Sequence, residues 1–216
     1  MVPKEAVIQQ ILEAFTANTY PGDAFLQGSF EGCEPFEETG AFKGRTDWTT
    51  LDAAMLDARY TALGFFSEAA FRFFLPAYLI ADLRGELRTA EPLFHLTGGF
   101  IVFSAQLPAG PHAHTRKTGG STLLNPRRYG AITFEDYGRY RLSVFTREEA
   151  KAIVAYLRCK QESDEYGIDT PAILAAINTF WLDRSEHAPT RASLEAHLVE
   201  ETEFLAHLRT NPSKQS

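Results

Sequence analysis

The chain has 216 residues, with 21 lysines and arginines, 28 aspartates and glutamates, and a net charge of −7. Apolar residues make up 44% and charged residues 23%, which is typical of a globular domain and excludes collagen-like and low-complexity chains. This length is enough for one domain whose core needs neither a disulfide nor a metal. The two cysteines, Cys33 and Cys159, stand far apart and in no motif, so we expect free thiols and a cytoplasmic location.

The most apolar stretch, residues 69–83, is interrupted by Arg72, Pro76 and Asp82. It is also shorter than the roughly 20 residues that a membrane-spanning helix needs. The first residues run directly into an amphipathic pattern without an apolar leader, so we expect neither a signal peptide nor contact with a membrane.

The first predicted helix has apolar residues at helical spacing, and Pro21-Gly22 ends it; its inner face is Ile8, Ile11, Leu12 and Phe15. A second helix is predicted from about Asp47. The glycine-rich stretch between them, residues 23–45, is interpreted as a loop with one short strand near residues 34–37.

A third helix is predicted from an N-cap at Ser67 to Gly85. Pro76 lies inside it and removes one main-chain donor, so we expect a kink or a break there. Phe71, Phe73 and its neighbour Phe74 cannot share one helix face, which predicts a helix buried on all sides. Arg72 among them would then need a carboxylate or carbonyl partner.

The last third of the chain is predicted to be helical. Thr146 and Glu149 have the spacing of a capping box, Thr170 before a proline indicates another N-cap, and a final helix is expected from about Thr190 to Arg209. In the middle of the chain, residues 100–107 fit a strand or a short buried helix, and residues 140–144 alternate as a short strand would.

Together these patterns predict a mainly α, single-domain protein of five to seven helices with at most a few short strands. The domain is expected to span residues 1–210, with a long loop near residues 108–130, because this stretch lacks apolar periodicity. Residues 211–216 are expected to form a disordered tail.

Several segments resemble a family of small bacterial proteins known only as a domain of unknown function. They are the stretch GFFSEAAFRFFLPAYL at residues 64–79, Tyr20-Pro21-Gly22-Asp23, the segment from Gly44 to Trp48, the segment from Phe145 to Leu157, and Phe180-Trp181. The resemblance covers roughly residues 1–184. It implies a mainly helical cytosolic protein and no catalytic residues.

His112 and His114 are the one histidine pair at the spacing of metal ligands. A third ligand by residue type would be His95, Glu135 or Asp136, none at a diagnostic spacing. The adjacent Arg116-Lys117 would oppose a cation, so we expect no metal and no cofactor. The histidines and glutamates of the last helix fall one residue short of a zinc motif and are interpreted as a solvated face; they are His197, Glu200, Glu201 and His207.

Charge is uneven along the chain, because residues 112–147 carry a net charge of +5 within a chain of net charge −7. Arg116, Arg127 and Arg128 are the candidate binding residues of this basic stretch, for a phosphate or another small ligand. Alternatively, its arginines pair with acidic groups of the same molecule. The acidic balance of the whole chain argues against nucleic acid as the partner.

The sequence contains no complete set of nucleophile, acid and base, and no phosphate-binding loop. We therefore expect a non-enzymatic binding or accessory module with an unknown protein or small-molecule partner. Two alternatives stay open: a metal-assisted hydrolase that uses His112 and His114, and a phosphate or small-ligand binder that uses Arg127 and Arg128.

Overall fold

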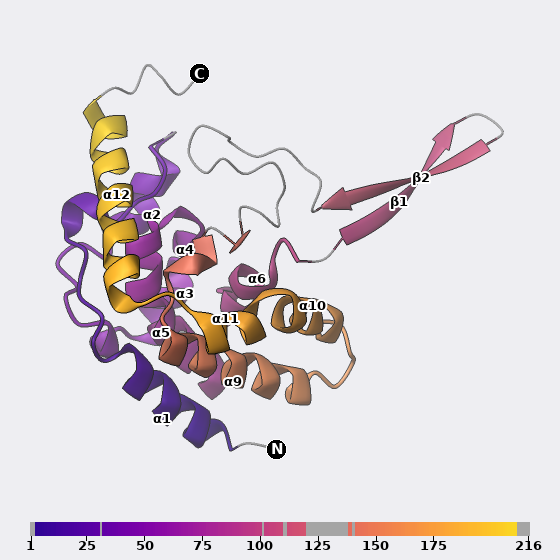
Figure 1. Cartoon of the computed structure of the whole chain (residues 1–216), viewed down its shortest axis with the longest axis horizontal. Helices are drawn as coiled ribbons and strands as arrows, with labels where there is room; N and C mark the ends of the chain where they lie inside the picture. The colour runs from indigo at the N-terminus through magenta and orange to yellow at the C-terminus, as the bar shows by residue number, and fades with distance from the viewer. Residues whose placement is uncertain are drawn as a thin grey trace.

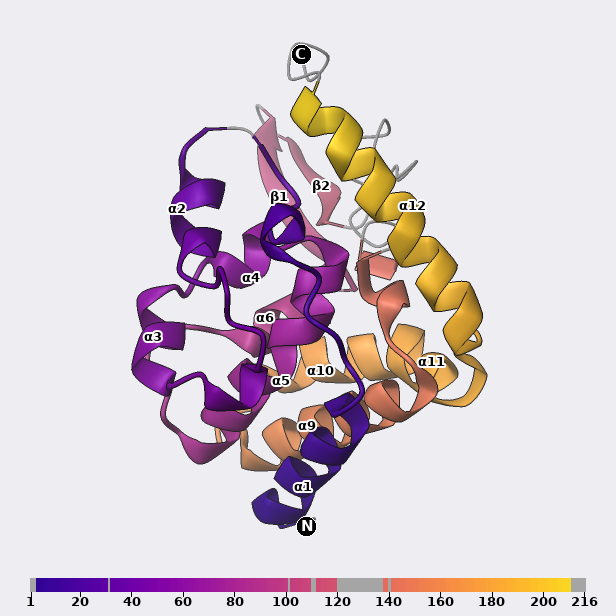
Figure 2. The ribbon, with the colours of Figure 1, turned by 90° about the vertical axis from the view of Figure 1, so that its left-hand side faces the viewer.

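The computed structural model describes residues 3–30, 32–100, 102–109, 112–119, 138–139 and 141–210, and it is mainly helical (Figures 1 and 2). The helices are α1 (Lys4–Phe15), α2 (Glu34–Gly40), α3 (Ala53–Ala58), α4 (Ala62–Phe65), α5 (Glu68–Arg84), α6 (Pro92–Thr97), α9 (Arg147–Ser163), α10 (Thr170–Ala176), α11 (Leu182–His187) and α12 (Arg191–Thr210). A π-helical turn, Ile177–Trp181, joins α10 to α11. The strands are β1 (Val102–Ala109) and β2 (His112–Gly119). In the part of the chain described, no helix combines the length and apolar character required to cross a membrane.

Helix α5 forms the centre of the core, as its sequence predicts. The hydroxyl of Ser67 accepts a hydrogen bond from the N–H of Ala70 at the N-terminus, and Gly85 ends the helix with a positive φ of 72°. The rings that cannot share one face are all buried; they belong to Phe71, Phe73 and Phe74. The helix is therefore covered by its neighbours on every side.

Of the kink or break expected at Pro76, the break does not occur, because α5 runs without interruption from Glu68 to Arg84. Pro76 cannot donate to the carbonyl of Arg72 one turn earlier. That carbonyl instead accepts a hydrogen bond of 3.3 Å from the side-chain amide of Asn18. A donor from a distant part of the chain thus replaces the missing main-chain donor.

Helices α1 and α9 lie side by side against α5 (Figure 2). The inner face of α1 is buried as predicted through Ile8, Ile11 and Phe15. The capping box of α9 is also confirmed: Thr146 Oγ1 accepts from the N–H of Glu149, and the Glu149 carboxylate accepts from the N–H of Thr146.

The predicted start of α10 at Thr170 is off by one residue, since Asp169 is the N-cap and Thr170 the first helical residue. The Asp164 carboxylate orders this start by accepting the N–H groups of Ile168, Asp169 and Thr170. The final helix, α12, begins as expected just after Thr190, whose hydroxyl accepts from the N–H of Ser193.

Three local predictions are wrong. Residues 34–40 form helix α2 and not a strand, because Pro35 stands in the first helical turn with the carboxylates of Glu34 and Glu37. The helix expected from Asp47 is split: a 3₁₀ turn, Trp48–Thr50, precedes α3, whose N-cap is Asp52. Residues 142–144 form a 3₁₀ turn that buries both Leu142 and Val144, so the expected strand is absent there.

The middle of the chain contains an antiparallel hairpin that projects from the helical body (Figure 1). Strand β1 confirms the strand interpretation of residues 100–107. Strand β2 contradicts the predicted loop over residues 112–119, because its main chain pairs with β1 from Val102 opposite Gly119 to Ala109 opposite His112. The rest of that predicted loop, residues 120–130, and the predicted tail, residues 211–216, lie outside the described residues.

Candidate functional site

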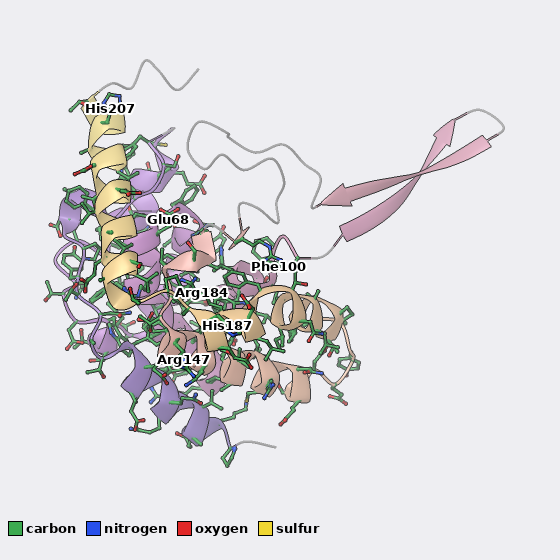
Figure 3. The ribbon with its side chains drawn as sticks, in the orientation of Figure 1. Glu68, Phe100, Arg147, Arg184, His187 and His207 are labelled. Atoms are coloured by element: carbon green, nitrogen blue, oxygen red, sulfur yellow. The ribbon has the colours of Figure 1, made fainter. Side chains whose placement is uncertain are left out.

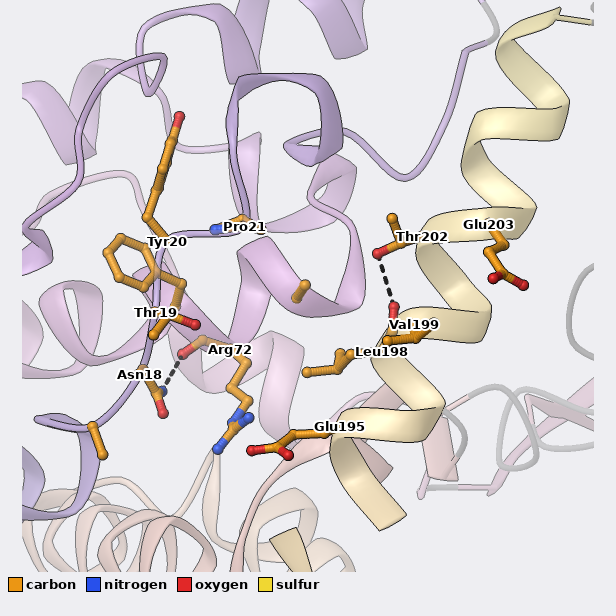
Figure 4. Close-up of a pocket in the computed structure, with 13 residues that line it drawn as sticks. Asn18, Thr19, Tyr20, Pro21, Arg72, Glu195, Leu198, Val199, Thr202 and Glu203 are labelled. Atoms are coloured by element: carbon orange, nitrogen blue, oxygen red, sulfur yellow. Dashed lines mark hydrogen bonds between the residues drawn. The ribbon is translucent and has the colours of Figure 1, made fainter. Parts of the chain in front are cut away.

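A groove of about 610 Å³ opens between the chain segment after α1, the first half of α5, and α12 (Figure 4). It is lined by Ala17, Asn18, Thr19, Tyr20, Pro21, Ala69, Arg72, Phe73, Glu195, Leu198, Val199, Thr202 and Glu203. These residues come from three regions that are distant in the sequence. The groove therefore depends on the tertiary fold and on no local motif.

The first wall is held in place by Tyr20. Its ring packs edge-on against Phe73, with centroids 5.6 Å apart, and against Phe74 at 6.2 Å. Its hydroxyl donates a hydrogen bond to the carboxylate of Asp23, which also accepts from the N–H of Gly44. Burial and the bond to Asp23 raise the pKa of Tyr20 to about 12. The phenol consequently stays protonated at neutral pH and acts as a structural donor.

At one end of the groove, Arg72 forms a buried ion pair with Glu149. The Arg72 Nε atom lies 3.1 and 2.9 Å from the two carboxylate oxygens, and Nη2 lies 2.9 Å from Oε1. The Glu149 side chain is 1% exposed and that of Arg72 12%, so this is the partner that the burial of Arg72 demands. The expectation of a carboxylate or carbonyl partner for Arg72 is confirmed.

Helix α12 supplies the opposite wall. Leu194 and Leu205 are buried and hold the helix against the body. Glu195, Val199 and Glu203 follow one another at four-residue intervals, so they form one stripe along α12. Val199 is 56% exposed, although a large apolar side chain in a groove is ordinarily covered. Figure 4 shows the Glu195 carboxylate on the side of the groove that faces Arg72.

The groove combines an apolar and aromatic surface with carboxylates at its rim, which is suited to binding. Within the ranges that the structure describes, no group of three or more histidine, cysteine, aspartate or glutamate side chains is placed to hold a metal ion. Neither Glu195 nor Glu203 makes an ion pair with any described residue. Both carboxylates are exposed and available to a ligand.

A model of a family of unknown function, DUF6714, matches residues 4–185. The chain belongs to the DUF6714 family. No curated protein and no solved structure matches it. The match includes two walls of the groove, the segment 17–21 and helix α5, and ends before α12 begins at residue 191. The expected membership in a family of unknown function is therefore confirmed.

The described residues that line the groove of this DUF6714 protein include none of the binding candidates that the sequence offers. Arg116 stands on β2 opposite Ala105, whereas Arg127 and Arg128 lie outside the described residues. His112 and His114 stand two positions apart on β2. The groove could not be predicted from the sequence, because its walls come from segments that are distant in the chain. The one local indication of it is Val199, which stands between two glutamates on one helical stripe.

Of the proposed third metal ligands, Glu135 and Asp136 lie outside the described residues, and His95 is half-buried beside aromatic side chains of the DUF6714 domain. The His95 ring lies against Phe71, with centroids 6.4 Å apart, and against Phe94 at 5.4 Å. Burial, together with the charge of Arg141, lowers the pKa of His95 to about 3. The imidazole is consequently neutral over the physiological range.

Two arginines of the basic stretch bind main-chain carbonyls of the fold. Arg141 donates to the carbonyl of Leu63, and its guanidinium lies 4.5 Å from the centroid of the Phe71 ring. Arg139 donates to the carbonyl of Thr179 at 3.0 Å. These two cations join separate parts of the helical body.

Proposed function

We propose that this protein is a non-enzymatic binding module and that the groove beside α12 is its binding site. The observation that carries the proposal is the exposed side chain of Val199 in a groove of about 610 Å³. This volume lies within the range of roughly 300–1,000 Å³ that binding sites occupy. A partner that covers Val199 would remove apolar surface from water, which favours association.

The arrangement of the carboxylates supports binding over catalysis. Glu195 and Glu203 are eight residues apart on α12, which corresponds to about 12 Å along the helix axis. Paired catalytic carboxylates of glycoside hydrolases stand roughly 5–9.5 Å apart, closer than this spacing provides. Two free thiols, Cys33 and Cys159, support our proposal of a cytoplasmic location.

The experiment is a selection of peptides from a displayed library on the full-length protein. Binding of the selected peptides is then measured to wild type, to Val199→Asn and to a matched control, Ile168→Asn, at an apolar side chain that is 77% exposed and outside the groove. We expect Val199→Asn to weaken binding at least tenfold and the control to leave it unchanged. Equal binding to all three proteins would overturn the proposed site.

One alternative keeps a specific observation in its favour. His112 and His114 stand two positions apart on strand β2, a spacing that suits two ligands of one metal ion. A metal-assisted hydrolase would contain a stoichiometric metal in protein purified without a metal affinity column. We expect far less than one equivalent, and a full equivalent that is lost in the His112→Ala/His114→Ala variant would favour the hydrolase.

A further inference from the structure

We infer that the groove beside α12 receives a basic peptide segment of a partner protein, in which two cationic side chains flank an apolar one. This inference rests on the proposed binding function and specifies its ligand. It follows from the charges in the groove, from their spacing along α12, and from the apolar position between them.

The first step is the charge balance of the lining residues. Among the described residues that line the groove, the one cation is Arg72, and its bidentate pair with Glu149 neutralises it. Glu195 and Glu203 make no ion pair with any residue that the structure describes. Among the described residues, both carboxylates thus lack a cationic partner, and they favour a cationic ligand over an anionic one.

The second step is the spacing of these groups. The backbone positions of the two glutamates are about 12 Å apart along the helix axis, and Val199 lies midway between them on the same stripe. A helical segment with lysine or arginine at positions i and i+8 and leucine at i+4 repeats this spacing on a single face. A small organic cation would reach only one of the two carboxylates, so the spacing favours a peptide segment.

The third step is the origin of the two sides of the groove. The apolar and aromatic side, with Tyr20 and Phe73, lies within the region matched by the DUF6714 family, residues 4–185. The acidic side lies on α12, beyond that region. The selectivity for cations is consequently a property of the C-terminal helix, whereas the apolar floor is supplied by the family domain.

The experiment uses two fluorescein-labelled helical peptides that differ only at the flanking positions. One carries lysine at i and i+8 around a central leucine, and the other carries glutamate at the same two positions. Fluorescence anisotropy against the full-length protein measures each dissociation constant at low salt. We expect the lysine peptide to bind at least tenfold more tightly than the glutamate peptide, and added salt to weaken it.

Variants of α12 locate the effect. Glu195→Gln/Glu203→Gln is expected to weaken binding of the lysine peptide by about tenfold. Glu200→Gln is the matched control, because Glu200 is an exposed glutamate of the same helix that does not line the groove, and it is expected to leave binding unchanged. Circular dichroism confirms that each variant keeps its helical content.

The outcomes separate this inference from the proposed function. If the two peptides bind equally and Val199→Asn weakens both, the preference for cations is wrong and the binding site stands. If neither peptide binds, the inference is wrong, and the library selection alone decides the proposed function. Tighter binding of the lysine peptide that is lost in the double glutamine variant supports the inference.

Discussion

The side-chain amide of Asn18 donates a hydrogen bond of 3.3 Å to the main-chain carbonyl of Arg72, the carbonyl that Pro76 leaves without its helical donor. Asn18 thus acts in two places: it supports the main chain of α5, and together with the side chain of Arg72 it lines the groove. The continuity of α5 through its proline and the shape of the groove therefore depend on the same contact.

This contact predicts coupling between Asn18 and Pro76. Asn18→Ala removes the donor to a part-buried carbonyl and is expected to lower the free energy of unfolding by about 1 kcal/mol. In a Pro76→Ala background the new N–H of residue 76 can donate to the carbonyl of Arg72, so the same Asn18→Ala change should cost less. Urea unfolding of the four proteins completes the double-mutant cycle. Additive effects would show that the two residues do not share this carbonyl.

The ion pair between Arg72 and Glu149 gives a second prediction. Glu149→Ala leaves the buried guanidinium unpaired and also removes the acceptor for the N–H of Thr146, so we expect it to lower stability by roughly 3–5 kcal/mol. The double variant Arg72→Met/Glu149→Met should lose less stability than the sum of the losses in the single variants Arg72→Met and Glu149→Met. The matched control is Glu148→Ala, whose carboxylate pairs with Lys151 at the surface and is expected to matter by less than about 1 kcal/mol. A double replacement as costly as that sum would refute the coupling.

Local signals predicted most of the helices because each depends on residues close in the sequence. The caps at Ser67 and Thr146 need only the next three residues, and the periodicity of α1 needs only its own side chains. The sequence predicted that Arg72 has a carboxylate or carbonyl partner, because a buried cation requires one. It could not predict that this partner is Glu149, because that depends on how α5 packs against α9. Strand β2 could not be predicted, because its extended conformation depends on pairing with β1 and not on its own composition.

The groove could not be predicted, because its three walls come from residues 17–21, helix α5 and helix α12. The absence of a break at Pro76 could not be predicted for the same reason, because the donor to the Arg72 carbonyl belongs to Asn18, 54 residues before Arg72. In both cases the contact that determines the local structure joins residues far apart in the chain, and a single sequence does not reveal such contacts.

Replacement by alanine is expected to have opposite effects on stability at two glycines, Gly98 and Gly40. A Cβ atom at Gly98 would lie 2.9 Å from the main-chain oxygen of Phe94, and that oxygen is held by the N–H of Gly98 at 2.8 Å. Gly98→Ala is therefore expected to lower stability by about 1–3 kcal/mol. At Gly40 no atom lies within 4 Å of the added Cβ and the residue is helical, so Gly40→Ala should raise stability by about 0.4–1 kcal/mol. Thermal unfolding compares both variants with wild type.

The half-buried imidazole of His95 predicts how stability depends on pH. Its pKa is lowered from the ordinary value of 6.5 to about 3, first by burial and then by the charge of Arg141. Between these two values the unfolded chain binds a proton that the folded chain does not, so His95 makes the folded state less stable as the pH falls from about 6.5 towards 3. The slope approaches about 1.4 kcal/mol per pH unit for this single group.

Replacing His95 with glutamine removes this proton-binding difference, so the fall in stability from pH 6.5 to 4 should be shallower in His95→Gln than in wild type. The comparison uses urea unfolding at several pH values, because the difference in slope is informative even if the variant is less stable throughout. If His95→Gln keeps the full slope of wild type, the imidazole is not the group that makes the fold sensitive to acid.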